Sequence, residues 1–239
     1  MEATAGIPID LKNIKVCIAY PSPDLVHTEF MNDVIQLITN SGQYVKLGIT
    51  TSTSSRIAVN RNELVKNARL TGSTHILFID SDTKFPIAGL MQLLMHDKDI
   101  VCATTCRRVG DDRTAIGLAM DFEEAKLGHQ LVRMREIGMP FMLVKLSVFD
   151  KFDELGFAPD NVYFADVPRW MLRQIGWKVD GVEAMMGEDH YFCYLALKAG
   201  YEIWCDMELS MSIGHMGMNC HYIKNPEQIA REAKVDEVL

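Results

Sequence analysis

The chain lacks the features of a membrane protein and of a protein that binds polyanions. None of its apolar runs approaches the ~20 residues of a transmembrane helix, and residues 1–11 lack the basic-then-apolar order of a signal peptide. Positive charge is scarce, because 24 lysines and arginines stand against 32 acidic residues, which gives a net charge of −8. Surfaces for nucleic acid or anionic lipid need clustered positive charge, so we expect neither partner. The composition favours an acidic enzyme or binding domain, and we expect a cytoplasmic location.

Cysteine and glycine are not arranged as in several common classes of site. The six cysteines are scattered and lie mostly in apolar runs, so we expect reduced thiols in the core. Cys102 and Cys106 have no second pair of ligands at a spacing suitable for zinc. The glycine-rich motifs of dinucleotide-binding and P-loop proteins are absent as well, which disfavours those two classes.

What the sequence does contain is an alternation of strands and helices over its first ~105 residues. The predicted strands lie at residues 14–20, 44–49, 75–79 and 99–104, and the predicted helices at about 25–39, 56–70 and 86–95. The Thr/Ser-rich stretch 50–55 is predicted to be a loop. Such an alternation predicts an α/β fold, in which helices flank a central, mostly parallel, twisted sheet.

The second half of the chain is less regular. Its predicted elements are extended segments within 131–144, a helix at 147–155, a helix at 188–199 and a strand at 201–205, with irregular stretches at 107–126 and 160–187. No linker or repeat separates the halves. We therefore predict a single domain over residues 1–239, with a first half at 14–105, a second half at 106–218 and a C-terminal tail at 219–239.

Two carboxylates follow the third predicted strand, in the sequence Asp80-Ser81-Asp82. Ligands of parallel α/β sheets bind at the carboxyl ends of the strands, so these side chains are placed at a possible site. Two acidic groups at the mouth of a buried strand concentrate negative charge, and Mg²⁺ or Mn²⁺ would neutralise it. The alternative is a structural turn or helix cap, which Asp and Ser also favour.

Three motifs resemble those of the GT-A glycosyltransferases, in particular the small family-2-like enzymes of bacteria, phages and large viruses. Residues 75–86 read His-Ile-Leu-Phe-Ile-Asp-Ser-Asp-Thr-Lys-Phe-Pro, and an Arg-Asn pair at 61–62 precedes them. Residues 187–193, Gly-Glu-Asp-His-Tyr-Phe-Cys, resemble the Glu-Asp motif that opens a helix in the family. Residues 213–217, Ile-Gly-His-Met-Gly, resemble its late histidine motif. The likeness covers roughly residues 14–218 and follows the family's order.

The resemblance implies a GT-A domain and a metal-dependent glycosyltransferase. Its donor would be a nucleotide-diphosphate sugar, with UDP as the default, and its acceptor a carbohydrate or another hydroxyl compound. Asp82 and His215 would bind Mn²⁺ or Mg²⁺ directly, with Asp80 as a further metal ligand or, together with Ser81, as a contact to the donor's ribose or sugar. Without the resemblance, the glycines on both sides favour a surface histidine in a turn over a metal ligand.

Glu188 and Asp189 open a predicted helix, where the helix dipole favours carboxylates for structural reasons alone. In the functional interpretation one of them is the general base that deprotonates the acceptor hydroxyl. The family resemblance assigns this role to Asp189, with Glu188 as the second choice or as a ligand of the acceptor hydroxyl, and it implies inversion at the anomeric carbon.

Further candidates for donor contact lie in the first half. Arg61 points to the apolar face of its helix and therefore needs an anionic partner, either the carboxylates of the metal motif or the donor diphosphate. Arg56 lies at the entry of the same helix. By the family resemblance, Tyr20-Pro21-Ser22 would hold the base and ribose; the alternative is a turn that only ends the strand.

Further candidate contacts lie at the end of the fourth predicted strand and in the second half of the chain. Arg107 and Arg108 follow the fourth predicted strand and could meet phosphate or only solvent, while Trp170 and Trp177 could stack on an acceptor sugar or pack in the core. The segment 138–143 resembles the family's Gly-x-Gly-Phe-x-Leu, but Pro140 replaces the second glycine.

Two other functions remain open at the level of the sequence. A sugar nucleotidyltransferase of the same fold would need a basic, glycine-rich loop after the first strand, where this chain has Tyr20-Pro21-Ser22-Pro23-Asp24. A non-catalytic nucleotide- or carbohydrate-binding module with a structural Ca²⁺ would bind metal without turnover. The oligomeric state is not predicted.

Overall fold

A computed structural model describes residues 10–22, 25–106, 117–121, 130–176, 184–217 and 220–223. Over these residues the fold is built on an eight-stranded sheet with the order β2-β1-β3-β8-β5-β11-β7-β6. Six strands run in one direction, and β7 and β8 run in the other. The predicted α/β class with a mostly parallel sheet is therefore confirmed. The strands are β1 (Lys15–Pro21), β2 (Lys46–Ser52), β3 (His75–Ile79), β5 (Ile100–Ala103), β6 (Gly117–Ala119), β7 (Leu131–Ile137), β8 (Phe141–Lys145) and β11 (Ile203–Asp206).

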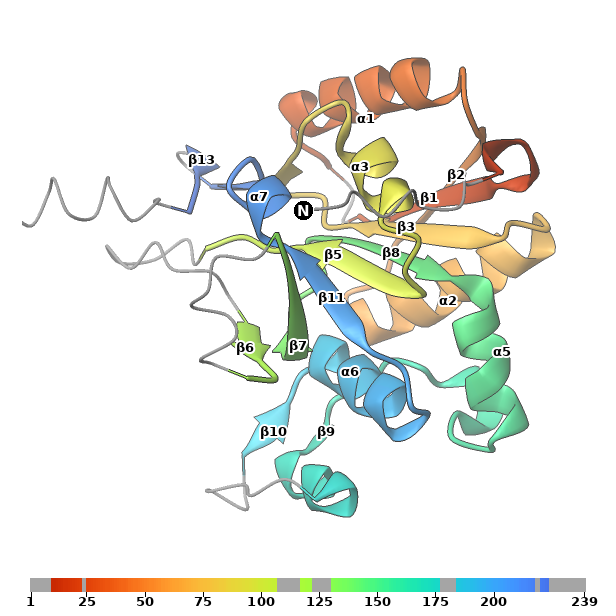
Figure 1. The fold of residues 1–239 in the computed structure, drawn as a ribbon, viewed down its shortest axis with the longest axis vertical. Coiled ribbons are helices and arrows are strands. Elements are labelled where there is room, and N and C mark those ends of the chain that lie inside the picture. The colour runs from red at the N-terminus through yellow and green to blue at the C-terminus, as the bar shows by residue number, and fades with distance from the viewer. Residues whose placement is uncertain are drawn as a thin grey trace, which may run out of the picture.

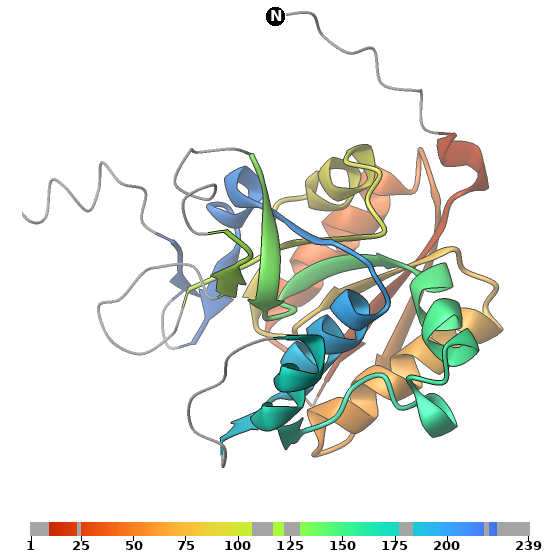
Figure 2. The same ribbon diagram turned by 60° about the horizontal axis from the view of Figure 1, so that its bottom comes forward.

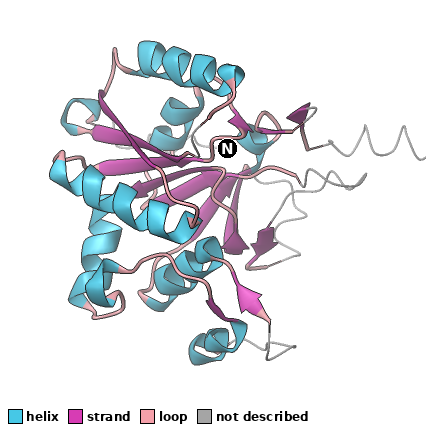
Figure 3. Ribbon diagram, turned by 180° about the vertical axis from the view of Figure 1, so that it is seen from behind, coloured by secondary structure: helices cyan, strands magenta, loops and turns pink. Residues whose placement is uncertain are grey.

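Helices cover both faces of this sheet (Figures 1 and 3). On one face lie α1 (Thr28–Ser41) and α3 (Gly89–Met95), and on the other lie α2 (Ile57–Leu70), α5 (Leu146–Glu154) and α6 (Glu188–Lys198). Each layer encloses its own cluster of buried hydrophobic residues. This double cover explains why every residue of β3 is buried, as its uninterrupted apolar sequence predicts.

The helices form where apolar residues recur at helical spacing. In α1 the buried Phe30, Val34 and Leu37 follow one another at intervals of four and three residues and face the sheet. In α6 all residues from Tyr191 to Ala196 are buried, because this helix packs between β7 and η3. The dense packing of α6 fixes the direction of its first turn, which carries Glu188 and Asp189.

Shorter elements lie outside the eight-stranded sheet. A three-stranded sheet has the order β13-β12-β4, and a two-stranded sheet joins β9 to β10 beside α6 (Figure 2). These elements are β4 (Thr83–Lys84), β9 (Val167–Pro168), β10 (Met185–Met186), β12 (Gly214–Met216) and β13 (Cys220–His221), with α7 (Met207–Ser210) and the 3-10 helices η1 (Leu11–Asn13), η2 (Pro159–Asn161) and η3 (Arg169–Ile175).

The structure corrects several details of the predicted organisation. The strand order, which the sequence left open, places the antiparallel β8 between β3 and β5. The expected loop 50–55 is shorter, since β2 continues to Ser52 in register with Pro21. Within the expected irregular stretch 160–187, β9, η3 and β10 are regular elements. Strands from both predicted halves share one sheet.

Five of the six cysteines are buried free thiols, as expected for a reduced core. Burial raises the pKa of Cys17 to about 11, which makes this thiol unreactive. None of the helices in the described part of the chain combines the length and the apolar character needed to cross a membrane.

Candidate functional site

Most of the predicted site residues meet in one cavity of about 490 Å³ at the carboxyl ends of β1 and β3. The first turn of α6, one face of α2 and β12 complete its walls. The lining consists of Pro21, Ser22, Ser54, Ser55, Ile57, Asn60, Arg61, Asp80, Ser81, Asp82, Glu188, Asp189 and His215. Residues up to 194 positions apart in the sequence, Pro21 and His215, thus face the same space.

Arg61 lies in the wall of this cavity and joins its two acidic motifs. Its Nη2 donates to Asp80 Oδ1 at 2.9 Å, and its Nη1 donates to Glu188 Oε1 at 2.8 Å. The side chain is 4% exposed, because Arg61 shares the inward face of α2 with the buried Leu64 and Ala68. The inward direction predicted for Arg61 is confirmed, and its anionic partners are protein carboxylates.

Burial and charge act against each other at this ion-pair triad. Burial raises the pKa of both Asp80 and Glu188, and the nearby Arg61 guanidinium only partly opposes that effect. Burial by itself lowers the pKa of Arg61, but the surrounding carboxylates more than offset this and raise it. Arg61 therefore stays charged, while the two carboxylates hold their protons to a higher pH than exposed carboxyl groups do.

Asp82 and His215 face each other across the cavity. The His215 Nε2 lies 3.6 Å from Asp82 Oδ2. The pairing of β12 with β4 holds the two together, because His215 is opposite Thr83 and the Met216 N–H donates to the Asp82 carbonyl at 2.7 Å. At the other ring nitrogen, Nδ1 lies 2.9 Å from the carbonyl oxygen of Cys106. A carbonyl only accepts, so Nδ1 carries a proton; in the neutral form of the ring, Nε2 then carries the lone pair and faces Asp82.

Asp189 occupies the next position of the α6 turn. Its Oδ1 accepts the backbone N–H of His190 at 2.8 Å, and its side chain is 25% exposed. Two glycines border the carboxylate: a Cβ at Gly187 would lie 3.1 Å from Oδ1, and one at Gly138 would lie 3.5 Å from Oδ2. The backbone thus approaches Asp189 closely while its carboxylate stays open to the cavity.

Not every predicted donor contact lines the cavity. Pro21, Ser22 and Ser81 do. Tyr20 does not, because its ring packs edge-on against Phe30 on the α1 side of the sheet, with centroids 5.2 Å apart. Arg56 is exposed just before α2 and is outside the lining.

The remaining candidates of the second half are only partly described. Trp170, on η3, is 43% exposed rather than buried in the core. Arg107, Arg108 and Trp177 lie outside the described residues, as does most of the predicted tail 219–239.

Sequence reasoning missed the wall formed by Ser54, Ser55 and Asn60. Asn60 is 3% exposed; its Oδ1 accepts from the Ser52 hydroxyl at 3.1 Å, and its Nδ2 donates to the Ser54 carbonyl at 2.9 Å. Asn60 therefore fixes the loop that carries both serines. Its position four residues before Leu64, on the inward face of α2, was the signal available in the sequence.

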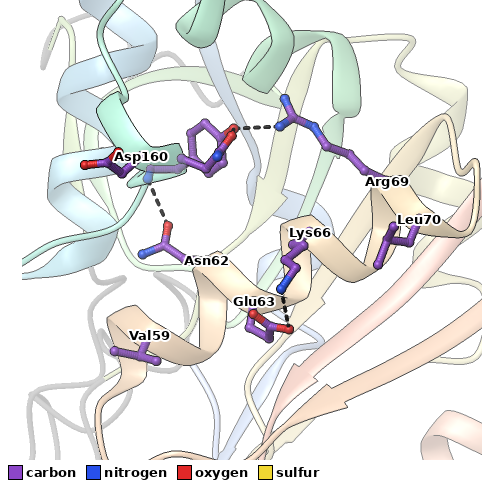
Figure 4. A pocket seen from close by; sticks show the side chains of 9 residues that line it. Val59, Asn62, Glu63, Lys66, Arg69, Leu70 and Asp160 are labelled. Atoms are coloured by element: carbon purple, nitrogen blue, oxygen red, sulfur yellow. Dashed lines mark hydrogen bonds and ion pairs between the residues drawn. The ribbon is translucent and has the colours of Figure 1, made fainter.

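A larger cavity of about 760 Å³ lies on another face of α2, toward η2 (Figure 4). Val59, Asn62, Glu63, Lys66, Arg69 and Leu70 of α2 line it, with Asp160, Asn161 and Tyr163 opposite. Figure 4 shows its polar side chains bonded among themselves: Lys66 pairs with Glu63, and Arg69 donates to the Tyr163 hydroxyl. It contains none of the predicted site residues.

Comparisons with known proteins give evidence on the fold. No protein-family model and no curated protein matches the sequence. The crystal structure of A197 from STIV is similar with a TM-score of 0.50 at 13% identity, covering 89% of this chain and 95% of that chain. This likeness supports a shared fold and does not identify an activity.

Two further solved structures show weaker similarity. A mutant of Drosophila beta-1,4-galactosyltransferase 7, in complex with manganese, UDP-Gal and xylobiose, has a TM-score of 0.48 at 12% identity, over 90% of this chain and 72% of that chain. The 4-diphosphocytidyl-2C-methyl-D-erythritol synthase from Anaerococcus prevotii has a TM-score of 0.43 at 10% identity, over 95% of this chain and 98% of that chain.

Proposed function

We propose that the protein is a glycosyltransferase that moves a sugar from a nucleotide-diphosphate donor, by default UDP, to a hydroxyl acceptor. The observation that carries this proposal is the convergence of three sequence motifs in one cavity: Asp80-Ser81-Asp82, Glu188-Asp189 and His215. Their order resembles that of the GT-A glycosyltransferases, and their meeting place at the carboxyl ends of β1 and β3 is where α/β folds bind ligands.

The residues present fit a divalent cation that is shared with the substrate. Asp82 and His215 offer a carboxylate oxygen and an imidazole nitrogen 3.6 Å apart, and the Cys106 carbonyl orients the ring by its contact with the other ring nitrogen, as such partners do for histidines that bind metals. Among the described residues no group of three or more His, Cys, Asp or Glu side chains could hold a metal. Mg²⁺ characteristically takes one or two protein carboxylates and completes its shell with substrate phosphates and water. Two ligands therefore suffice, for Mg²⁺ or Mn²⁺.

The charges of the cavity support the same interpretation. Asp80, Asp82, Glu188 and Asp189 are acidic, and the guanidinium of Arg61 is already bonded to two of them. A diphosphate entering this space would meet net negative charge. When bound, a divalent cation at Asp82 and His215 would offset that charge and stabilise the leaving diphosphate as a Lewis acid. Donor binding should therefore depend on the metal.

Asp189 is the residue we assign as general base. Glu188 is bonded to the Arg61 guanidinium and is 12% exposed, whereas Asp189 is 25% exposed and is bonded to a backbone N–H of its own turn. In the reaction the acceptor oxygen attacks the anomeric carbon, the bond from that carbon to the diphosphate breaks, and Asp189 takes the hydroxyl proton. A single in-line displacement of this kind inverts the anomeric configuration. Glu188 then serves to hold Arg61 in place.

The test is a transfer assay with Mn²⁺ and a panel of sugar nucleotides, which measures release of the nucleoside diphosphate. We expect turnover that EDTA abolishes, and a loss in kcat/KM of about a thousandfold in Asp82→Asn, since Lewis-acid stabilisation is worth several kcal/mol. Asp160→Asn is the matched control. It makes the same chemical change in the larger cavity, and asparagine tolerates the positive φ of 56° found there.

The outcomes separate the alternatives. Absence of both turnover and metal-dependent nucleotide binding would overturn the proposal. Release of pyrophosphate from a nucleoside triphosphate would identify a nucleotidyltransferase instead. Metal and nucleotide binding without any turnover, unchanged in a Glu188→Ala/Asp189→Ala double variant, would identify a binding module.

A further inference from the structure

A buried carboxylate lies behind the proposed general base. Glu136 is 2% exposed, although it continues the inward alternation of Val132 and Met134 along β7, where an apolar residue would be expected. A buried charge is costly unless it is paired and hydrogen-bonded. Charged or titratable groups from three elements face Glu136: Arg135 of β7 at 3.6 Å, Arg169 at the start of η3, and His190 of α6 at 3.6 Å.

Arg169 makes the close contacts to this carboxylate. Its Nη2 lies 2.8 Å from Glu136 Oε1 and 2.7 Å from Oε2. The backbone N–H of Arg169 donates to the Ala184 carbonyl at 2.8 Å, beside the antiparallel pairing of β9 with β10. The chain runs from β10 through Gly187 directly into α6. Arg169 thus ties the segment that leads into the Asp189 turn to strand β7.

The same strand reaches Asp189 by two further routes. The His190 ring lies between the two carboxylates, with Nδ1 3.6 Å from Glu136 Oε2 and Nε2 4.0 Å from Asp189 Oδ1. Two residues after Glu136, the backbone at Gly138 is so close to Asp189 that a Cβ there would lie 3.5 Å from its Oδ2. The position of the Asp189 carboxylate therefore depends on how β7, η3 and the α6 turn are joined.

We propose that Glu136 and Arg169 are positioning residues, which fix the direction of the Asp189 carboxylate in the cavity. The inference rests on the proposed function, because it assigns Asp189 the role of base. A general base must lie within hydrogen-bond reach of the hydroxyl proton, and a displacement of 1 Å can cost about a hundredfold in rate. Asp82 and His215, the proposed metal ligands, lie on other elements. A substitution of Glu136 should therefore leave donor binding intact.

The experiment compares Glu136→Gln with Glu202→Gln in the transfer assay. Each change neutralises one carboxylate of an ion pair that involves a β7 residue. Glu136 pairs with Arg169 and is buried, whereas Glu202 pairs with Arg133 at 3.4 Å on the exposed surface. For Glu136→Gln we expect kcat to fall by about tenfold to a hundredfold, with the donor KM and Mn²⁺-dependent UDP affinity within about threefold of wild type. Glu202→Gln should match wild type in all three quantities.

A second series separates positioning from folding. Arg169→Met should lose as much kcat as Glu136→Gln, and Arg169→Lys should recover part of it by restoring the charge. Amide hydrogen exchange over residues 184–190 should be faster in Glu136→Gln and unchanged in Glu202→Gln.

An unchanged kcat in Glu136→Gln, or an equal loss of kcat and UDP affinity, would overturn the inference. If wild type turned over no sugar nucleotide at all, the proposed function would fail, and exchange over residues 184–190 would still decide whether Glu136 fixes this turn.

Discussion

Two faces of α2 border cavities of opposite character. On one face, Arg61 is 4% exposed and bonds Asp80 and Glu188 in a cavity of about 490 Å³. On the other, Glu63 and Lys66 form a 3.5 Å pair, 45% and 65% exposed, beside a cavity of about 760 Å³. The guanidinium of Arg61 is thus buried in the wall of the smaller cavity, where burial makes a charge costly, whereas Glu63 and Lys66 beside the larger cavity are solvated. If the smaller cavity is the site of the proposed reaction, the desolvation of the groups that line a cavity is a better guide to function here than its volume.

The first prediction is a large loss of stability when Arg61 is replaced. Arg61→Met leaves Asp80 and Glu188, which are 31% and 12% exposed, without their shared counter-charge. Breaking a buried pair costs about 3–5 kcal/mol, and we expect a loss at the lower end of that range because Asp80 is partly solvated. Arg69→Met is the matched control in the larger cavity. Arg69 pairs with Asp150 and Asp153, which are 60% and 34% exposed, so we expect a loss nearer 1 kcal/mol.

Urea unfolding at pH 7 measures both variants. Equal losses would contradict the contrast between the two faces. Adding Glu188→Gln to Arg61→Met should restore part of the stability, because it removes one of the carboxylates left without Arg61. No restoration would show that the cost came from packing of the arginine stem and not from charge.

The second prediction concerns pH and is smaller. Burial raises the pKa of Glu188, and Arg61 opposes this only in part, so the folded protein holds that proton to a higher pH than the unfolded chain does. The corresponding stability is present below the unfolded-state pKa and is lost as pH rises through the folded-state pKa. Glu188→Gln cannot ionise and avoids that loss. The unfolding free energy of the variant minus that of wild type should therefore be larger at pH 7 than at pH 4.

Urea unfolding of both proteins at the two pH values checks this sign. A Glu188→Gln variant that loses stability relative to wild type on going from pH 4 to pH 7 would show that Arg61 stabilises the ionised carboxylate beyond its desolvation cost. The two faces of α2 would then differ in exposure alone.

The parts of this fold that depend on local sequence were predictable, and the parts that depend on distant pairing were not. The apolar run 75–79 identifies β3 to the residue, since a strand covered on both faces needs no polar positions. The insertion of β8 between β3 and β5 leaves no local trace, because strand order is set by contacts between segments far apart in the chain.

At the candidate site, too, local spacing was informative and distant pairing was not predictable. Helical spacing shows that Arg61 points inward, but its partner Glu188 is 127 residues away, and spacing cannot identify it. The family resemblance implies a donor contact at Tyr20-Pro21-Ser22. Because side chains alternate along strands, however, Tyr20 faces α1 while Pro21 lines the cavity. Nothing in the sequence distinguishes Glu136 within the extended segment 131–144; its burial, at 2% exposed, is what distinguishes it.

The smallest expected effect belongs to the larger cavity. Glu63→Gln and Lys66→Ala each remove one partner of an exposed pair, and such pairs contribute about 0–1 kcal/mol. We expect unfolding free energies within about 0.5 kcal/mol of wild type and unchanged kcat/KM, although both residues line the greater volume. A loss of activity in either variant, with stability preserved, would mean that substrate contacts this face of α2. The bound acceptor would then contact both faces of α2, and the buried charges of the smaller cavity would identify only the donor half of the site.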